Sequence, residues 1–170
     1  MADFIWGIFL RPCSTLQQKT TAMLLNDLTT LFHRDLNKLK SELSQYRDER
    51  NIWALPPGIN NPAGNLVLHL IGNLNTYIGT ELGFTNYIRH REQEFSLRDV
   101  PRADLIAQID ATIAAINQIL PNLPPDYMAV EYPLLVFKET TSTGYFLVHL
   151  ATHLGYHLGQ VNYHRRLVEG

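Results

Sequence analysis

The stretch FLVHLATHLGYHLGQVNYH, residues 146–164, decides the fold that this sequence predicts. At about 100° per residue along an α-helix, its apolar side chains fall on an arc from about 20° to 140° measured from His153. The arc comprises Phe146, Leu147, Leu150, Leu154, Leu158 and Val161. The stretch is therefore expected to be a helix with one buried face, capped by Thr141 or Ser142 and reaching nearly to the C-terminus.

Two more helices are expected in the first half of the chain. Leucines and Phe32 recur at three- and four-residue spacing with charged residues between them, which predicts a helix over about residues 14–46. Asn61 and Pro62 are typical of an N-cap and a first turn, and Gly83 stands where a C-terminal stop is expected. A second helix is therefore expected between Pro62 and Gly83.

A further periodic stretch opens at Pro101 and ends at Pro121. Its apolar stripe comprises Leu105, Ile109, Ile113, Ile116 and Leu120. Residues 84–100 are polar and aromatic and are expected to be a crossover, while residues 128–137 contain Pro133 and are expected to be a loop or a lone strand. Four helices and two long connections predict an all-α four-helix bundle with crossover topology, forming a single domain over residues 1–170.

Composition excludes several classes of protein. The formal net charge of -2 argues against nucleic-acid binding. No run approaches the roughly 18 apolar residues of a membrane span, and the apolar residues 4–10 follow Asp3, where a signal peptide would carry positive charge. The single cysteine, Cys13, excludes an intramolecular disulfide and a thiolate-rich zinc site. We expect a cytoplasmic protein with neither nucleic-acid nor membrane partners.

Four of the seven histidines lie within residues 146–164. His153 and His157 differ by about 40° around the helix and about 6 Å along it, so both imidazoles can meet one ion. His157 lies inside the apolar arc and His153 at its edge, whereas His149 falls outside at about -40°. We therefore expect His153 and His157 to form the pair, with His149 as the substitute.

Two histidines make half a site, because zinc and similar ions take three protein ligands and leave one position open for catalysis. His69 is the histidine of the second expected helix, and the small and polar residues on its face leave room for water or a substrate. The sequence predicts one divalent ion, zinc or nickel, held by His69, His153 and His157, although imidazole also suits iron and copper. Asn73, Tyr77 and Tyr156 are expected at the mouth of this site.

Two alternatives stay open. Without a metal the histidines would form a polar network in the core, and with His149 as a fourth ligand the ion would be closed off and structural. Neither HLATH nor HLGYH carries the glutamate of the metalloprotease motif, and Glu81 alone in the second helix is too little for a ferritin-like di-iron site. The remaining histidines, His33, His90 and His164, are expected at the surface.

The segments NLVLHLIGNL around His69, RHREQEF downstream and VHLATHLGYHLGQ ending at Gln160 resemble the DinB/YfiT-like superfamily of proposed metalloenzymes. Bacillithiol S-transferases and mycothiol-dependent maleylpyruvate isomerases also represent this superfamily. The resemblance implies an up-down-down-up bundle with His69, His153 and His157 as ligands, a homodimer, and a transferase or hydrolase acting on a small molecule such as a low-molecular-weight thiol. Leu158 stands where many relatives have an arginine, which argues against an anionic or thiol-cofactor substrate if that arginine binds it.

Overall fold

The computed structural model describes residues 11–170, with side chains from residue 16 onwards. Within this range the chain is helical and forms no strand, since the pairing of Glu131 with Ser142 is an isolated bridge. The all-α prediction is therefore confirmed. The signal-peptide argument on residues 4–10 and the argument on the Cys13 side chain concern parts outside the described residues.

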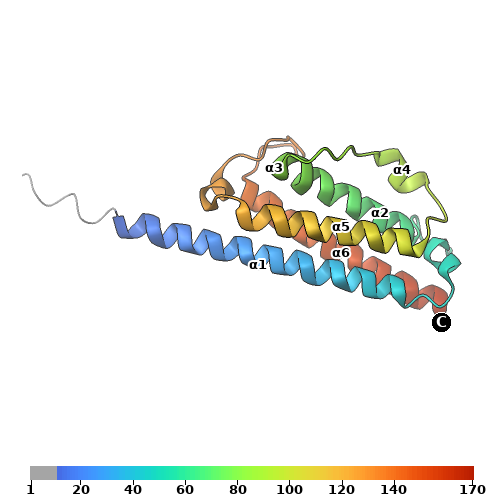
Figure 1. Cartoon of the computed structure of the whole chain (residues 1–170). Coiled ribbons are helices and arrows are strands. Elements are labelled where there is room, and N and C mark those ends of the chain that lie inside the picture. Colours follow the sequence, from blue (N-terminus) through green and yellow to red (C-terminus); the bar gives the residue numbers. More distant parts are fainter. Residues whose placement is uncertain (1–10) are drawn as a thin grey trace, which may run out of the picture.

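Four long helical segments enclose the core of the described chain (Figure 1). They are α1 (Arg11–Ser44), α2 (Ala63–Leu74) with its continuation, α5 (Arg102–Ile119) and α6 (Thr143–Glu169). Both α1 and α2 pack against α5 and α6. Buried side chains from all four helices, such as Phe32, Leu70, Ile109 and Phe146, join in one core cluster. The periodic stripes of the sequence therefore face a common interior.

Most helix boundaries follow the sequence signals, but at the start of α2 the N-cap is Pro62, whereas the sequence predicts Asn61. The helix expected over residues 14–46 is α1, and the predicted stripe of α5 is buried throughout. Pro121 falls in a 3-10 turn, η3 (Leu120–Asn122), which ends that helix. Ser142 is the cap of α6, because its side-chain oxygen accepts a hydrogen bond from the Tyr145 N–H at 3.2 Å. Of the apolar arc on α6, Leu158 alone is only partly buried.

The end of the second helix has a different cause from the one expected. From α2 the helix continues through the π-helical turn η2 (Asn75–Thr80) to α3 (Glu81–Gly83). The left-handed residue is Phe84, with φ 52°, so Gly83 is not the conformational stop. A Cβ at Gly83 would overlap the side chain of Ile119. Glycine is needed here because α3 approaches α5 closely.

The crossover expected over residues 84–100 contains a short helix, α4 (Arg91–Ser96), which packs against α2 (Figure 1). The 3-10 helix η1 (Glu49–Trp53) also covers α2. Together with α5 and α6 these elements bury every residue of α2. Complete burial agrees with a helix that carries apolar residues on all sides.

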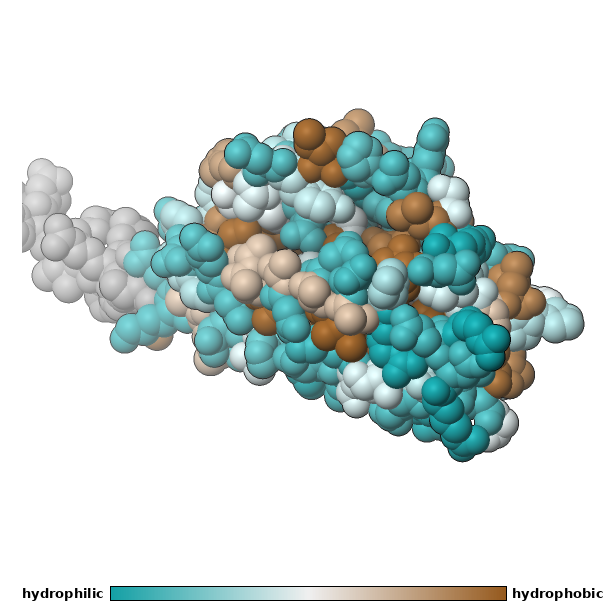
Figure 2. Space-filling model, turned by 45° about the vertical axis from the view of Figure 1, so that its right-hand side comes forward, coloured by the Kyte–Doolittle hydropathy of each residue, from teal (hydrophilic) through white to brown (hydrophobic). Residues whose placement is uncertain are grey.

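The segment 128–137 forms no strand. Its first two residues end the 3-10 helix η4 (Pro125–Ala129), and the residues after them are a loop, as one of the two sequence alternatives had it. Some apolar side chains of the crossover are exposed, such as Phe84 and Ile88. Figure 2 shows apolar patches among hydrophilic residues on one face of the molecule. Among residues 11–170, no helix combines the length and apolarity that crossing a bilayer requires.

His164 was expected at the surface, and that prediction is wrong, because only 4% of the residue is exposed. Its Nδ1 accepts a hydrogen bond from the Tyr46 hydroxyl at 2.8 Å, and its Nε2–H donates to the Ala54 carbonyl at 2.9 Å. Burial lowers the pKa of His164, which favours the neutral ring that these two bonds require. At about 20° from His153 it lies at the edge of the apolar arc, so its burial follows from helical geometry once Tyr46 provides a partner. His33 and His90 are exposed, as expected.

We expect His164→Ala to lower the free energy of unfolding by about 2–4 kcal/mol, because the change leaves the buried Tyr46 hydroxyl and Ala54 carbonyl without partners. Urea denaturation followed by circular dichroism measures this loss. His33→Ala is the matched control, and its effect should stay within about 0.5 kcal/mol because the side chain is exposed. Equal stability of the two variants would contradict the structural role of His164.

Candidate metal centre

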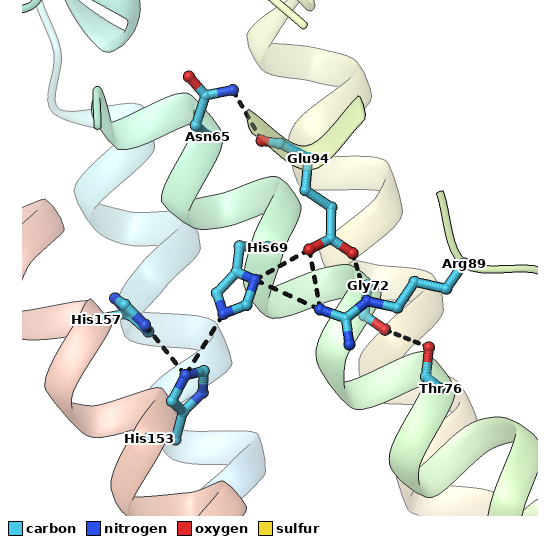
Figure 3. Close-up of polar contacts among 8 residues, drawn as sticks. All are labelled: Asn65, His69, Gly72, Thr76, Arg89, Glu94, His153 and His157. Carbon is cyan, nitrogen blue, oxygen red and sulfur yellow. Dashed lines mark hydrogen bonds and ion pairs between the residues drawn. The ribbon is translucent and has the colours of Figure 1, made fainter. Parts of the chain in front are cut away.

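Three histidines from two helices converge on one point (Figure 3). His69 comes from α2, and His153 and His157 come from successive turns of α6. The Nε2 atom of His153 lies 3.4 Å from Nε2 of His69 and 3.1 Å from Nε2 of His157. All three ligand atoms lie within 4.8 Å of one another, which is close enough to bind a metal ion.

The two distances from His153 agree with tetrahedral coordination. Nitrogen ligands about 2.0–2.1 Å from a zinc ion lie about 3.3–3.4 Å from one another when the geometry is tetrahedral. The observed separations of 3.1 and 3.4 Å lie near that value. The residues present therefore fit a divalent ion at the point where the three Nε2 atoms meet.

Outer hydrogen bonds set which ring nitrogen carries the proton. The Nδ1 of His69 lies 3.0 Å from Glu94 Oε2, and the Nδ1 of His157 lies 2.6 Å from Gln160 Oε1. Both oxygens are acceptors, so each Nδ1 donates its hydrogen and each Nε2 keeps an unshared pair directed at the centre. The unshared electron pairs of His69 Nε2 and His157 Nε2 therefore both point to the centre of the cluster, where they favour a cation. This pattern is the one that ligating histidines show around a metal.

Electrostatics favour neutral rings at this centre. Burial first, then the neighbouring His157 and His69, lower the pKa of His153 to about 4. Burial also lowers the pKa of His157, against a raising effect of the hydrogen bond to Gln160. Since metals bind the neutral imidazole, the shift at His153 keeps that side chain in the ligating form well below neutral pH, and the shift at His157 acts in the same direction.

Glu94 is the polar anchor behind His69. Its carboxylate accepts hydrogen bonds from Arg89, at 2.6 Å from Nε to Oε1 and 2.9 Å from Nη2 to Oε2, as well as the one from His69. Burial raises the pKa of Glu94, but the hydrogen bonds from His69 and Arg89 outweigh it, and the net pKa is lowered. The buried side chain is therefore a carboxylate, and it places a negative charge beside the histidine cluster.

Local backbone features let Glu94 reach His69. The side-chain amide of Asn65 donates to the carbonyls of Glu94 at 2.8 Å and Leu97 at 3.0 Å, which holds α4 against α2. A Cβ at Gly72 would overlap Glu94 Oε1, so only glycine leaves space for the carboxylate at this position. Figure 3 shows Glu94 between Asn65 and His69, with Arg89 on its far side.

Sequence reasoning missed Glu94 and Arg89. Both belong to the charged string of residues 89–94, which was interpreted only as part of a crossover. The available signal was a largely apolar helix whose one acidic residue, Glu81, lies far along it from His69. A buried His69 therefore needed an acceptor from elsewhere in the chain. The RHREQEF segment that contributes to the family resemblance contains both residues.

The other sequence candidates are distributed as follows. His149 does not join the three histidines, and its ring packs against Phe137, with centroids 4.8 Å apart, and against Phe146 at 5.8 Å. Tyr77 packs edge-on against Phe146 at 5.3 Å. Asn73 is buried, and its Oδ1 has no hydrogen-bond partner within the described residues. Tyr156 is exposed, with its ring 5.2 Å from that of His157.

Comparison with known proteins gives one match. A family model for the DinB superfamily matches residues 17–161, which is most of the chain. Searches of curated proteins and of solved structures gave no match. The matched range contains all three histidines of the cluster together with Arg89 and Glu94.

We expect Glu94→Gln to weaken Zn²⁺ binding by about 10- to 100-fold, because the amide keeps the size of the side chain but removes the charge that polarises His69. Competition against a chromophoric chelator measures the affinity. Glu92→Gln is the matched control, since Glu92 lies on the same short helix and is exposed. Unchanged affinity in Glu94→Gln would contradict the role of the carboxylate behind His69.

Proposed function

Because the chain belongs to the DinB superfamily, we propose that it is a metal-dependent enzyme whose divalent ion is held by His69, His153 and His157. One observation carries the proposal. The Nε2 of His153 lies 3.1 Å from that of His157 and 3.4 Å from that of His69. The Nδ1 atoms of His69 and His157 each donate a hydrogen bond to an oxygen on the other side of the ring. Zinc or nickel is the ion we expect, because both accept imidazole ligands.

The residues around the centre suit a catalytic ion. When bound, such an ion supplies Lewis acidity that lowers the pKa of a thiol or water at its open position. Three neutral imidazoles would leave its positive charge largely uncompensated, since the carboxylate of Glu94 contacts His69 from behind. Arg89 holds Glu94 ionised, and Glu94 and Gln160 orient the rings of His69 and His157.

The reaction class that we propose is group transfer to or from a low-molecular-weight thiol, or a related hydrolysis. Support comes from the superfamily and from the ligand set, which offers three protein ligands rather than four. The cluster includes no carboxylate, so a nucleophile at the open position would be the one anionic ligand. The substrate would approach from the side of His157, whose neighbours Tyr156 and Gln160 are exposed.

We also infer the up-down-down-up arrangement of a four-helix bundle in a single domain. Two observations support it. The first is that α1 and α2 both contact α5 and α6. The second is the order of colours in Figure 1, which run in one direction along α1 and α6 and in the opposite direction along α2 and α5.

We propose further that the protein acts in the cytoplasm as a homodimer, without nucleic-acid or membrane partners. The single cysteine supports the cytoplasmic location, and the net charge of -2 supports the absence of a nucleic-acid partner. Exposed apolar side chains on neighbouring helices, Leu24 on α1 and Val148 on α6, are available for contact with a second copy.

Metal content tests the proposal directly. We expect His153→Ala to lose most of the divalent metal that the untagged protein carries, because the change removes the nitrogen that lies between the other two. Elemental analysis by mass spectrometry measures the metal-to-protein ratio. His33→Ala, at an exposed site outside the cluster, should keep the full ratio. Equal metal content in both variants would overturn the ligand assignment. The three histidines would then be a polar network rather than a metal centre.

The alternative function is a metal-stabilised bundle that binds a small ligand or partner without turnover. It requires a closed ion, for which His149 would be the fourth ligand. The observation in its favour is proximity, since the rings of His149 and His153 lie 6.0 Å apart on successive turns.

Cobalt substitution separates these two functions. With three protein ligands, azide or a small thiol should enter the coordination sphere of Co²⁺ and shift its visible spectrum. His149→Ala should give the same shift as the unchanged protein, because His149 packs against Phe137 rather than in the cluster. A spectrum that responds to neither azide nor thiol in the unchanged protein, but responds in His149→Ala, would favour the closed site.

A further inference from the structure

A pocket of about 580 Å³ adjoins the histidine cluster. One wall is the loop after η1, residues 58–61, and the other is the exposed side of α6 from Tyr156 to His164. The loop owes its shape to a tight turn, in which Gly58 has φ +81° and the Ile59 N–H donates to the Pro56 carbonyl at 3.1 Å. His157 also lines the pocket, so a molecule in it would lie beside a residue of the proposed metal centre.

The lining of this pocket has no formal charge. Among the described residues around it there is no lysine, arginine, aspartate or glutamate. His164 uses both ring nitrogens within the fold, and His157 has its Nδ1 committed to Gln160. The polar groups that remain are side-chain amides and tyrosine hydroxyls, alongside apolar Ile59 and Leu66. The lining therefore offers no fixed positive charge to pair with a carboxylate or a phosphate group.

Two tyrosines and a glycine form a slot on the α6 side of the pocket. Tyr156 and Tyr163 are seven residues apart, so they lie within about 20° of each other around the helix. Their side chains are exposed, at 65% and 68%. Gly159 lies between them, and nothing lies within 4 Å of the position that its Cβ would occupy. The bare backbone at Gly159, with an exposed aromatic side chain about one turn before it and another about one turn after it, suits a flat ring.

Gln160 offers the directional contact. Its Oε1 accepts the hydrogen of His157 Nδ1 at 2.6 Å, which leaves its amide nitrogen as a donor with no partner within the described residues. An acceptor oxygen on a bound molecule can take this N–H without breaking the bond to His157. A ligand held in this way would be neutral and aromatic, and would carry a carbonyl or a similar oxygen.

The geometry points to this pocket as the binding site for an uncharged aromatic group of the substrate, seated over Gly159 between Tyr156 and Tyr163 with its oxygen on the Gln160 amide. Calling this molecule the substrate rests on the proposed function, because that proposal makes His157 part of the reactive centre. The binding site itself depends only on residues of the pocket. Its own residues recognise a ligand by shape and neutral hydrogen bonding, and none of them carries a charge that would favour an anion.

The probes that test this site are benzamide, benzoate and cyclohexanecarboxamide, titrated by ligand-observed NMR into the full-length protein after its metal has been removed with a chelator and again after zinc loading. Benzamide should bind at least about tenfold more tightly than either of the others to the metal-free protein. Benzoate tests the discrimination against charge, and cyclohexanecarboxamide tests the need for a flat ring. Equal affinity for benzamide and benzoate in the metal-free protein would overturn the proposal.

Gly159→Leu fills the slot and should weaken benzamide binding by at least about tenfold. Gly155→Leu is the matched control, because Gly155 lies on the same helix with nothing within 4 Å of its Cβ position and does not line the pocket. Its affinity should remain within about twofold of the unchanged protein. Tyr163→Ala is a second variant, at an exposed position, and should weaken binding as Gly159→Leu does.

Equal effects of Gly159→Leu and Gly155→Leu, or no effect of Tyr163→Ala, would show that benzamide binds elsewhere and would overturn the site. The proposed metal function fails by a separate measurement, the metal content of His153→Ala. Benzamide binding that survives in His153→Ala, together with unchanged metal content, would retain the pocket and remove the metal centre.

Discussion

The complete burial of α2 is the constraint on which the rest of the structure depends. Every residue of Ala63–Leu74 is buried, including Asn65, His69 and Asn73, which follow one another at four-residue spacing along one stripe. Polar groups in an interior need hydrogen-bond partners, because unpaired ones cost free energy. The crossover supplies partners for two of the three, since Asn65 donates to the Glu94 and Leu97 carbonyls and His69 to the Glu94 carboxylate, whereas the Oδ1 of Asn73 has none within the described residues. The short helix α4 is thus a part of the core rather than a loop that happens to lie over it.

That arrangement divides the histidine cluster into a dry side and a wet side. On the dry side Glu94 is 5% exposed and is held by Arg89, and Gly72 gives it space. On the wet side Gln160 orients His157 from an exposed position on α6. A rigid buried anchor fixes one ring, while the opposite ring faces solvent and the uncharged pocket. Such a division suits a site that must keep its geometry and still admit a small molecule.

Glycines along the second helical segment allow neighbouring elements to approach closely. Gly72 leaves space for the carboxylate of Glu94, and Gly83 leaves space for Ile119 on α5. The second of these was interpreted from the sequence as a helix stop, because glycine near the end of a helix often has that role. Glycine alone does not reveal which role applies, since a close neighbour and a left-handed conformation both exclude a side chain. Whether a neighbour such as Ile119 lies close to the glycine depends on how the helices pack.

The sequence alone was enough to predict the four long helices, the buried stripes on α5 and α6, and the pairing of His153 with His157, because each depends on the local geometry of one helix. Tertiary structure decided which surfaces meet. It brought His69 to that pair, placed Glu94 behind His69 from 25 residues away, and buried His164 against Tyr46 from 118 residues away. The physical reason is that helical periodicity gives each side chain a direction, whereas a contact between helices depends on the packing of two faces that no local pattern relates.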